Sequence, residues 1–420
     1  MDERCFRVPP GDLERLRALA SRQAEIAAGD GMAKLYTDWL RHGSFAPGAR
    51  PMVTVELWTF ADEIIPGLME CESPRGRELE RTLLMYLIPR TMFGDDTPVR
   101  GYLPVPVRRT FDPLGMKVRK ITAGDSDAAG AGHRFLYHID DLVEQWSRLG
   151  KTRYAFDLPG TQREIDWINE LVGDILPARR CGETMDVHVA EDILHLMSME
   201  TLYVAMLEAP ELVHRMIGML AADYMKWLDD FEALGLLPTA SDELLPQGSF
   251  CFTDLLPSVG TGLRTEQVWG SLDAEEMDSV SPEMYREFIT EHYIPLARRF
   301  GALSFGCCEA VHRFWEGSVE RLPNLRKVSV SAWCDVDYMG ERLRGREIVF
   351  HRKPSANFLG VGRDLDEDAV RKYFRRTARA ASGCRLEISQ RDVYLLHGNT
   401  EKVRRYVELI RETLDREWRP

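Results

Sequence analysis

The second half of the chain alternates short apolar runs with amphipathic helical patterns, and this alternation constrains the fold more than any other feature. Four runs, at 302–305, 326–333, 347–351 and 384–388, are each followed by a helical pattern. Strands that alternate with helices predict parallel βαβ units. Consecutive units without a Rossmann-type glycine fingerprint favour a barrel over an open sheet. We therefore predict an α/β fold: a (β/α)8 TIM barrel over residues 49–420 with an N-terminal helical extension over residues 1–48.

Capping signals mark the start of several predicted helices. A helix over 281–301 has Ser281 in the N-cap position. A further helix is predicted over 310–322, directly after the first of the four runs. Asp364 and Glu367 have the spacing of a capping box and predict the start of a later helix.

Charge and composition exclude several classes of protein. The 420 residues are 44% hydrophobic and carry a formal net charge of −13, without a basic stripe. Such a chain is a poor candidate for binding nucleic acid or an anionic membrane surface. No run approaches the roughly 18 apolar residues of a membrane span. The N-terminus lacks the apolar stretch of a signal peptide, so we expect a cytoplasmic protein whose eight cysteines are reduced.

Polar and reactive residues follow each of the four apolar runs. They are "GCCE" at 306–309, "WCD" at 333–335, "HRKPS" at 351–355 and "SQRD" at 389–392. In a (β/α)8 barrel the active site gathers at the carboxyl ends of the strands. The sequence therefore predicts that these four groups meet at one end of the barrel.

The first of these groups is a candidate metal centre. Cys307, Cys308 and Glu309 offer the sulfur and oxygen donors that Zn²⁺ prefers, and His312 adds a nitrogen. Because neighbouring side chains diverge, we expect one cysteine to bind the metal and the other to pack beside it. The alternative is two buried thiols and a carboxylate placed by the dipole of the following helix.

A weaker candidate set combines His312 with Glu276 and Glu291, which are hard or borderline donors. Glu291 lies inside the predicted helix 281–301, where exposed glutamates are common. We therefore rank this set below the cysteine group.

Asp335, Arg352 and Lys353 are candidate catalytic and binding residues. Asp335 can act as a base or orient a ligand, although it can equally cap the next helix. Arg352 and Lys353 can bind a carboxylate or phosphate, although ion pairing within an acidic protein is an equal alternative. Trp333 precedes Asp335 by two positions and is a candidate substrate contact.

Candidate contacts also come from the first half of the chain. His188 shares one face of a short strand with Asp186, where structural polar contacts are the alternative. Glu56 and Trp58 close the strand predicted at 51–58 and are candidates for lining the site. The pair at 95–96, two aspartates before an extended segment, is a further candidate on weaker grounds.

Long stretches resemble the uroporphyrinogen decarboxylase-like superfamily. The residues that carry the resemblance are "MSMETLYVAMLEAPELVHRMIGMLAADYMKWLDDFEALG", "SPEMYREFITEHYIPLARRFG" and "SFGCCEAVHRFWEGSVERLPNLRKVSVSAWCDVDYMGERLRGREIVFHRKPSAN". The similarity spans about residues 50–415 and is most specific over 196–355. It implies a (β/α)8 barrel and one of two chemistries. These are cofactor-free decarboxylation of porphyrinogen carboxylates, and methyl transfer to or from a corrinoid on a partner protein with zinc activating the substrate.

The details of the motif favour the methyl-transfer branch. That branch typically has His-x-Cys-Gly at this strand end; here Gly306 stands at the histidine position, Cys308 matches the cysteine, and no cysteine follows the last strand. The "GCCE" and "RKP" pattern is similar to a subgroup found beside corrinoid proteins and tied to demethylation of methoxylated compounds. The arginine-rich N-terminal motif of the true porphyrinogen decarboxylases is absent, which argues against a porphyrin substrate.

These observations lead to three functional hypotheses. The first is a methyltransferase of the O-demethylase type that passes the methyl group of a small methylated, in particular methoxylated, substrate to cobalamin on a corrinoid protein. Zn²⁺ near Cys308 and Glu309 assists it, Asp335 or Glu309 transfers the proton, and Arg352 with Lys353 anchors the substrate. The second is a cofactor-free decarboxylase or lyase of a small carboxylated substrate. The third is a non-catalytic binding subunit.

Overall fold

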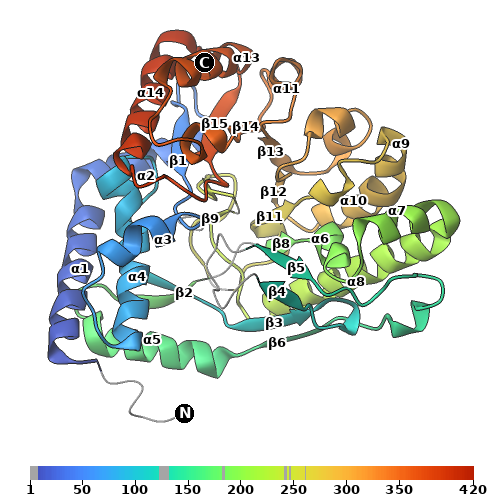
Figure 1. The fold of residues 1–420 in the computed structure, drawn as a ribbon, viewed down its shortest axis with the longest axis horizontal. Helices are drawn as coiled ribbons and strands as arrows, with labels where there is room; N and C mark the ends of the chain where they lie inside the picture. Colours follow the sequence, from blue (N-terminus) through green and yellow to red (C-terminus); the bar gives the residue numbers. More distant parts are fainter. Residues whose placement is uncertain (1–7, 123–131, 182–184, 241–243, 246, 261) are drawn as a thin grey trace.

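The centre of the molecule is a parallel sheet of seven strands, with helices around it (Figure 1). The computed structural model describes residues 8–122, 132–181, 185–240, 244–245, 247–260 and 262–420. In spatial order the strands are β1 (Met52–Val55), β15 (Arg385–Gln390), β14 (Val349–Arg352), β13 (Leu325–Val330), β12 (Ala302–Phe305), β11 (Trp269–Leu272) and β8 (Met185–Val187). The predicted α/β class and the parallel strands of the second half are confirmed.

The first strand of this sheet pairs with the last one. Val53 of β1 lies opposite Ile388 of β15, in parallel register. The order along the sheet therefore follows the chain from β8 to β15 and returns to β1, as it does around a barrel. Among the described residues β1 and β8 are the two edges of the sheet, so a closed barrel is not formed by these seven strands.

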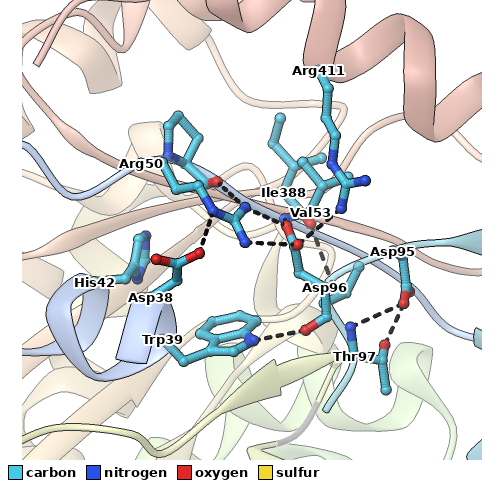
Figure 2. A network of polar contacts seen from close by, with 12 residues as sticks. Asp38, Trp39, His42, Arg50, Val53, Asp95, Asp96, Thr97, Ile388 and Arg411 are labelled. Carbon is cyan, nitrogen blue, oxygen red and sulfur yellow. Dashed lines mark hydrogen bonds and ion pairs between the residues drawn. The ribbon is translucent and has the colours of Figure 1, made fainter. Parts of the chain in front are cut away.

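Two aspartates form hydrogen bonds with the backbone groups along the free edge of β1 (Figure 2). Val53 donates its N–H to Asp96 Oδ2 at 2.8 Å, and its carbonyl accepts the N–H of Asp96 at 2.8 Å. Val55 donates to Asp95 Oδ2 at 2.8 Å. Carboxylates thus take the place of a neighbouring strand, which a buried strand edge requires. Asp95 and Asp96, predicted as candidates for lining the site, therefore serve the sheet edge.

Asp96 also ties the outer helices to β1 (Figure 2). Its carboxylate accepts two hydrogen bonds from Arg50, both at 2.9 Å, and one from Arg411 of α14 at 2.8 Å. Its carbonyl accepts the indole N–H of Trp39 of α2 at 2.7 Å. Asp96 thus joins α2 and the segment after it to α14.

Helices and small sheets complete the fold. The helices are α1 (Pro10–Ala28), α2 (Asp30–Gly43), α3 (Ala61–Ile64), α4 (Pro74–Ile88), α5 (Leu158–Val172), α6 (Val189–Leu194), α7 (Met199–Glu208), α8 (Pro210–Ala233), α9 (Pro282–Tyr285), α10 (Glu291–Ala297), α11 (Val336–Leu343), α12 (Asn357–Gly360), α13 (Glu367–Ala380) and α14 (Glu401–Glu417). Four two-stranded sheets pair β2 (Leu103–Pro106) with β7 (Ala178–Cys181), β3 (Arg109–Asp112) with β6 (Arg153–Phe156), β4 (Lys120–Thr122) with β5 (His133–Phe135), and β9 (Leu244–Leu245) with β10 (Ser249–Phe250). No helix in these described ranges is long and apolar enough to cross a membrane.

Two predicted helix features are wrong. The helix expected over 310–322 is replaced by two short turns, at 311–314 and 319–321, because Gly317 between them has a φ of 71° that a helix cannot accommodate. The expected capping box at Asp364 does not form either. Asp366 caps α13 instead, accepting the N–H of Ala369 at 2.9 Å. By contrast, Ser281 caps α9 as predicted.

The sheet presents apolar side chains to the surrounding helices and polar ones to its inner face. On β13 the buried Val328 alternates with Lys327, and on β15 the buried Leu386 alternates with Glu387. Lys327 Nζ and Glu387 Oε2 form a buried ion pair at 2.8 Å across the inner face. His351 of β14 contacts the same carboxylate at 3.7 Å. The polar inner face leads directly to the carboxyl ends of the strands.

Candidate functional site

The residues that follow the strands on the inner face form one polar cluster. Successive side chains of a strand point to opposite faces, so the residues that continue the inner face beyond each strand meet at one end of the sheet. They come from six strand ends: Glu56 after β1, His188 after β8, Asp273 after β11, Cys307 after β12, Lys353 after β14 and Arg391 after β15. This is the end at which parallel α/β sheets bind ligands.

Two thiols and a carboxylate stand at the middle of this cluster. The Sγ atoms of Cys307 and Cys308 are 3.7 Å apart, and both lie with an oxygen of Glu275 inside a group whose members are within 4.8 Å of one another. Glu275 also accepts the N–H of Cys308 at 3.1 Å. None of the cysteines in the described ranges forms a disulfide.

The geometry of the two thiols fits a shared metal ion. Two sulfurs bound to one tetrahedral zinc at about 2.3 Å lie about 3.8 Å apart. The separation of the sulfurs of Cys307 and Cys308, 3.7 Å, matches this value. We expected neighbouring side chains to diverge; here both sulfurs and Glu275 can serve as ligands of one ion, with the fourth position left for substrate.

Positive charge lies directly beside the thiols. Arg391 Nη1 is 3.3 Å from Cys307 Sγ, and its Nε donates to Glu56 Oε2 at 3.3 Å. Asp392 Oδ2 lies 3.6 Å from Cys308 Sγ. Burial would lower the pKa of Arg391, but the charges of Glu56, Cys307 and Asp392 together outweigh it and raise the pKa, so this guanidinium stays charged.

Lys353 and Gly306 shape the loop that carries the thiols. The ammonium of Lys353, only 3% exposed, donates to the carbonyls of Gly306 at 3.3 Å and Cys307 at 3.1 Å. Burial lowers the pKa of Lys353. Gly306 has a φ of 96°, and a Cβ there would lie 3.0 Å from the Cβ of Ser329. The loop therefore needs glycine at the position that precedes the thiols.

Glu309 lies behind the thiols and is 2% exposed. Its Oε2 accepts the N–H of Cys307 at 2.5 Å, and among the described residues its Oε1 has no hydrogen-bond partner. Burial, with the charge of Asp273 adding to it, raises the pKa of Glu309 to about 7. This carboxyl group can therefore hold or release a proton near neutral pH.

Acidic residues surround His188 on the other side of the site. Its ring nitrogens lie 3.4 Å from Asp186, 3.3 Å from Glu191 and 3.4 Å from Asp273. Burial alone would lower the pKa of His188, but the contacts with Asp186 and Asp273 together outweigh it and raise the pKa to about 12. Close by, burial and the charge of Asp273 raise the pKa of Glu276 to about 8. His188 is thus an imidazolium held by carboxylates.

Several residues predicted for the site lie elsewhere. Arg352 is on the opposite face of β14 from Lys353, where it donates to the carbonyl of Ser331 and to Tyr373. Glu291 forms an exposed ion pair with Arg321 at 2.7 Å. These positions follow from the alternation of side chains on a strand and from the exposed face of a helix.

Asp335, His312 and the two candidate tryptophans lie at the rim. Asp335 caps α11 by accepting the N–H groups of residues 337 and 338, both at 3.1 Å. His312 accepts the N–H of Asp335 at 3.3 Å, and burial lowers its pKa. Trp333 is 77% exposed and Trp58 is 48% exposed. The structure thus brings Cys307, Cys308 and Glu309 together but leaves His312 outside the thiol group.

Sequence reasoning missed four residues of the cluster as individual candidates. Arg391 and Asp392 belong to the "SQRD" group that was placed at the last strand end, so the signal was present. Glu275 and Asp273 follow β11, whose sequence "WGSL" did not stand out as a strand.

No family model matches this chain, and no curated protein matches it. Among solved structures it is similar to a "methyltransferase from Methanosarcina mazei", with 12% identity and a TM-score of 0.46, over 90% of this chain and 98% of that chain. A likeness of this size does not bear on what this chain does.

Proposed function

We propose that this chain is a methyltransferase of the O-demethylase type, which passes the methyl group of a small methoxylated substrate to the cobalamin of a partner corrinoid protein. One observation carries the proposal: Cys307, Cys308 and Glu275 lie at the end of the parallel sheet with the sulfur separation of two zinc ligands. A zinc ion held there would supply a Lewis acid that polarises the ether oxygen. We place the reaction in the cytoplasm, where thiols stay reduced.

The residues around the thiols supply the remaining chemistry. The contact with Cys308 and burial raise the pKa of the Cys307 thiol, while the positive charges of Lys353 and Arg391 oppose that rise and favour the thiolate form that a metal ligand needs. A cobalt(I) centre on the partner would accept the methyl group, and the electron pair of the broken carbon–oxygen bond would stay on the ether oxygen. We assign to Glu309, whose burial raises its pKa to about 7, the role of giving that oxygen its proton.

The rim of the site supports the presence of a protein partner. Trp333 is 77% exposed, Tyr394 46% and Leu395 54%. They lie on the loops that follow β13 and β15, at the end of the sheet that holds the thiols. Large exposed apolar side chains gathered beside a site are typical of a docking surface. We also infer that the sheet belongs to a (β/α)8 barrel, because its first strand pairs with its last.

The test is methyl transfer itself. The protein is incubated with cob(I)alamin, free and on a corrinoid protein, and with a panel of methoxylated compounds, and methylcobalamin is followed by its absorbance. We expect turnover with at least one compound and a loss of more than about 100-fold in Cys308→Ser. The control is Cys334→Ser, whose buried thiol contacts the carbonyl of Glu309 at 3.7 Å and lies outside the thiol group. No turnover across the panel would contradict the proposal.

A second candidate function is supported by the two cations. Lys353 and Arg391 face the inner side of the sheet end, where they could bind a carboxylate, as a cofactor-free decarboxylase requires. This alternative predicts carbon dioxide release that survives chelators and needs no corrinoid. Loss of activity on chelation would exclude it.

A further inference from the structure

We infer that a cavity across the free edge of β1 is the binding site for an aromatic ring. The cavity has a volume of about 410 Å³. Thr54 and Glu56 line it from the inner face of β1, and Val55 and Leu57 line it from the outer face. A cavity that reaches both faces of one strand must lie across the edge of that strand. This edge of β1 is the one that does not pair with β15.

The arrangement of the sheet edge explains why space remains there. The N–H groups of Val53 and Val55 are bound by the carboxylates of Asp96 and Asp95, so no strand needs to run alongside. The chain then continues through Pro98, which has no N–H to extend the pairing and which lines the cavity itself. The free edge of β1 is thus satisfied by carboxylates at Val53 and Val55, and the space beside it is left open as the cavity.

The remaining lining indicates the chemistry of the ligand. Met85 comes from α4, Phe250 from β10, and Trp58, Pro98 and Arg100 from loops. A thioether, aromatic rings and proline suit a flat aromatic group, through ring contacts and sulfur contacts. The volume falls in the range of about 300–1,000 Å³ that holds small molecules.

The cavity lies next to the thiols. Glu56 lines it, and its carboxylate accepts a hydrogen bond from Arg391 at 3.3 Å. Arg391 in turn lies 3.3 Å from the sulfur of Cys307. Glu56 and Arg391 therefore link the cavity to the candidate metal centre. This inference rests on the proposed function for its final step: the bound ring belongs to the substrate, whose methoxy group points past Glu56 toward the thiols.

The experiment measures binding and turnover separately. Methoxybenzene is the probe, and calorimetry gives its affinity for the full-length protein. Met85→Trp and, in case that variant does not fold, Thr82→Tyr fill the cavity from α4. Met219→Trp is the matched control, a half-buried methionine on α8 that does not line the cavity. Circular dichroism checks that each variant is folded.

We expect the wild type to bind methoxybenzene and either folded cavity variant to bind it at least about tenfold more weakly, which corresponds to about 1.4 kcal/mol. Met219→Trp should bind it within about twofold of the wild type. Absence of binding, or equal binding by a folded cavity variant, would overturn the inference. Equal binding of 1-methoxybutane would overturn its aromatic part.

The two proposals fail differently. Binding that the cavity variants weaken, without methyl transfer to cobalamin by the wild type, would refute the proposed function and leave the cavity assigned. Methyl transfer that the cavity variants leave unchanged would support the function and overturn the inference.

Discussion

Replacing Asp96 with alanine should destabilise the protein more than replacing Asp38, the other carboxylate that pairs with Arg50. The carboxylate of Asp96 is 2% exposed and accepts four hydrogen bonds, one from the N–H of Val53, two from Arg50 and one from Arg411. Without it the buried N–H of Val53 loses its partner, which costs about 1–3 kcal/mol. The two arginines can regain water because each is more than a third exposed, so each adds about 1 kcal/mol.

The sum is a loss of about 3–5 kcal/mol in the free energy of unfolding. Urea titration followed by circular dichroism measures it as a lower midpoint. Asp38→Ala is the control, because Asp38 pairs with Lys34 and Arg50 but caps no strand edge. It should cost about 1 kcal/mol or less. Equal losses in both variants would refute the reasoning that Asp96 replaces a neighbouring strand.

Three further predictions concern the inner face and the site. Lys327→Met leaves the buried Glu387 without its ion-pair partner and should cost about 3–5 kcal/mol in urea titration; a loss below about 1 kcal/mol would contradict this account. Gly306→Ala should lower stability by about 1–2 kcal/mol and weaken zinc binding, because L residues disfavour its φ of 96° and the new Cβ would approach Ser329. Burial raises the pKa of Glu309 from 4.5 to about 7, so the folded chain holds a proton that the unfolded chain releases, and its contribution to stability falls as pH rises from about 4.5 to about 7. In Glu309→Gln the free energy of unfolding, measured by urea titration at each pH, should no longer fall between about pH 4.5 and 7. An unchanged pH dependence would contradict the raised pKa of Glu309.

The periodicity of the sequence was sufficient to predict the parallel strands of the second half. Their apolar runs are short, end in polar groups and are separated by helical patterns, and each of these signals is local. The helix expected at 310–322 failed because its pattern was apolar enough for a helix, while Gly317 needs a backbone conformation that no helix allows. The free edge of β1 was not predictable from the sequence. The hydrogen bonds by which Asp95 and Asp96 satisfy it join segments that are distant in the chain.

The candidate site was predicted in part. The "GCCE" group stood out because thiols are rare in this chain, and the structure places both of them at the sheet end. Arg352 and Lys353 are neighbours in sequence, yet the alternation of β14 sends only Lys353 to the inner face. Glu275 could not be assigned from sequence, because nothing in "DAEEMD" distinguishes a ligand from an ordinary surface glutamate.

The most direct test of the account is the zinc content of the protein purified without added metal or chelator. Elemental analysis should give about one zinc per chain in the wild type and in Cys334→Ser, and a loss of that zinc in Cys308→Ser and in Glu275→Gln. The Glu275 variant is the sharper one, because its carboxylate reaches the thiols only in the folded arrangement. Zinc that persists in both ligand variants, or an active wild type without zinc, would contradict the assignment of the thiol group as a metal centre.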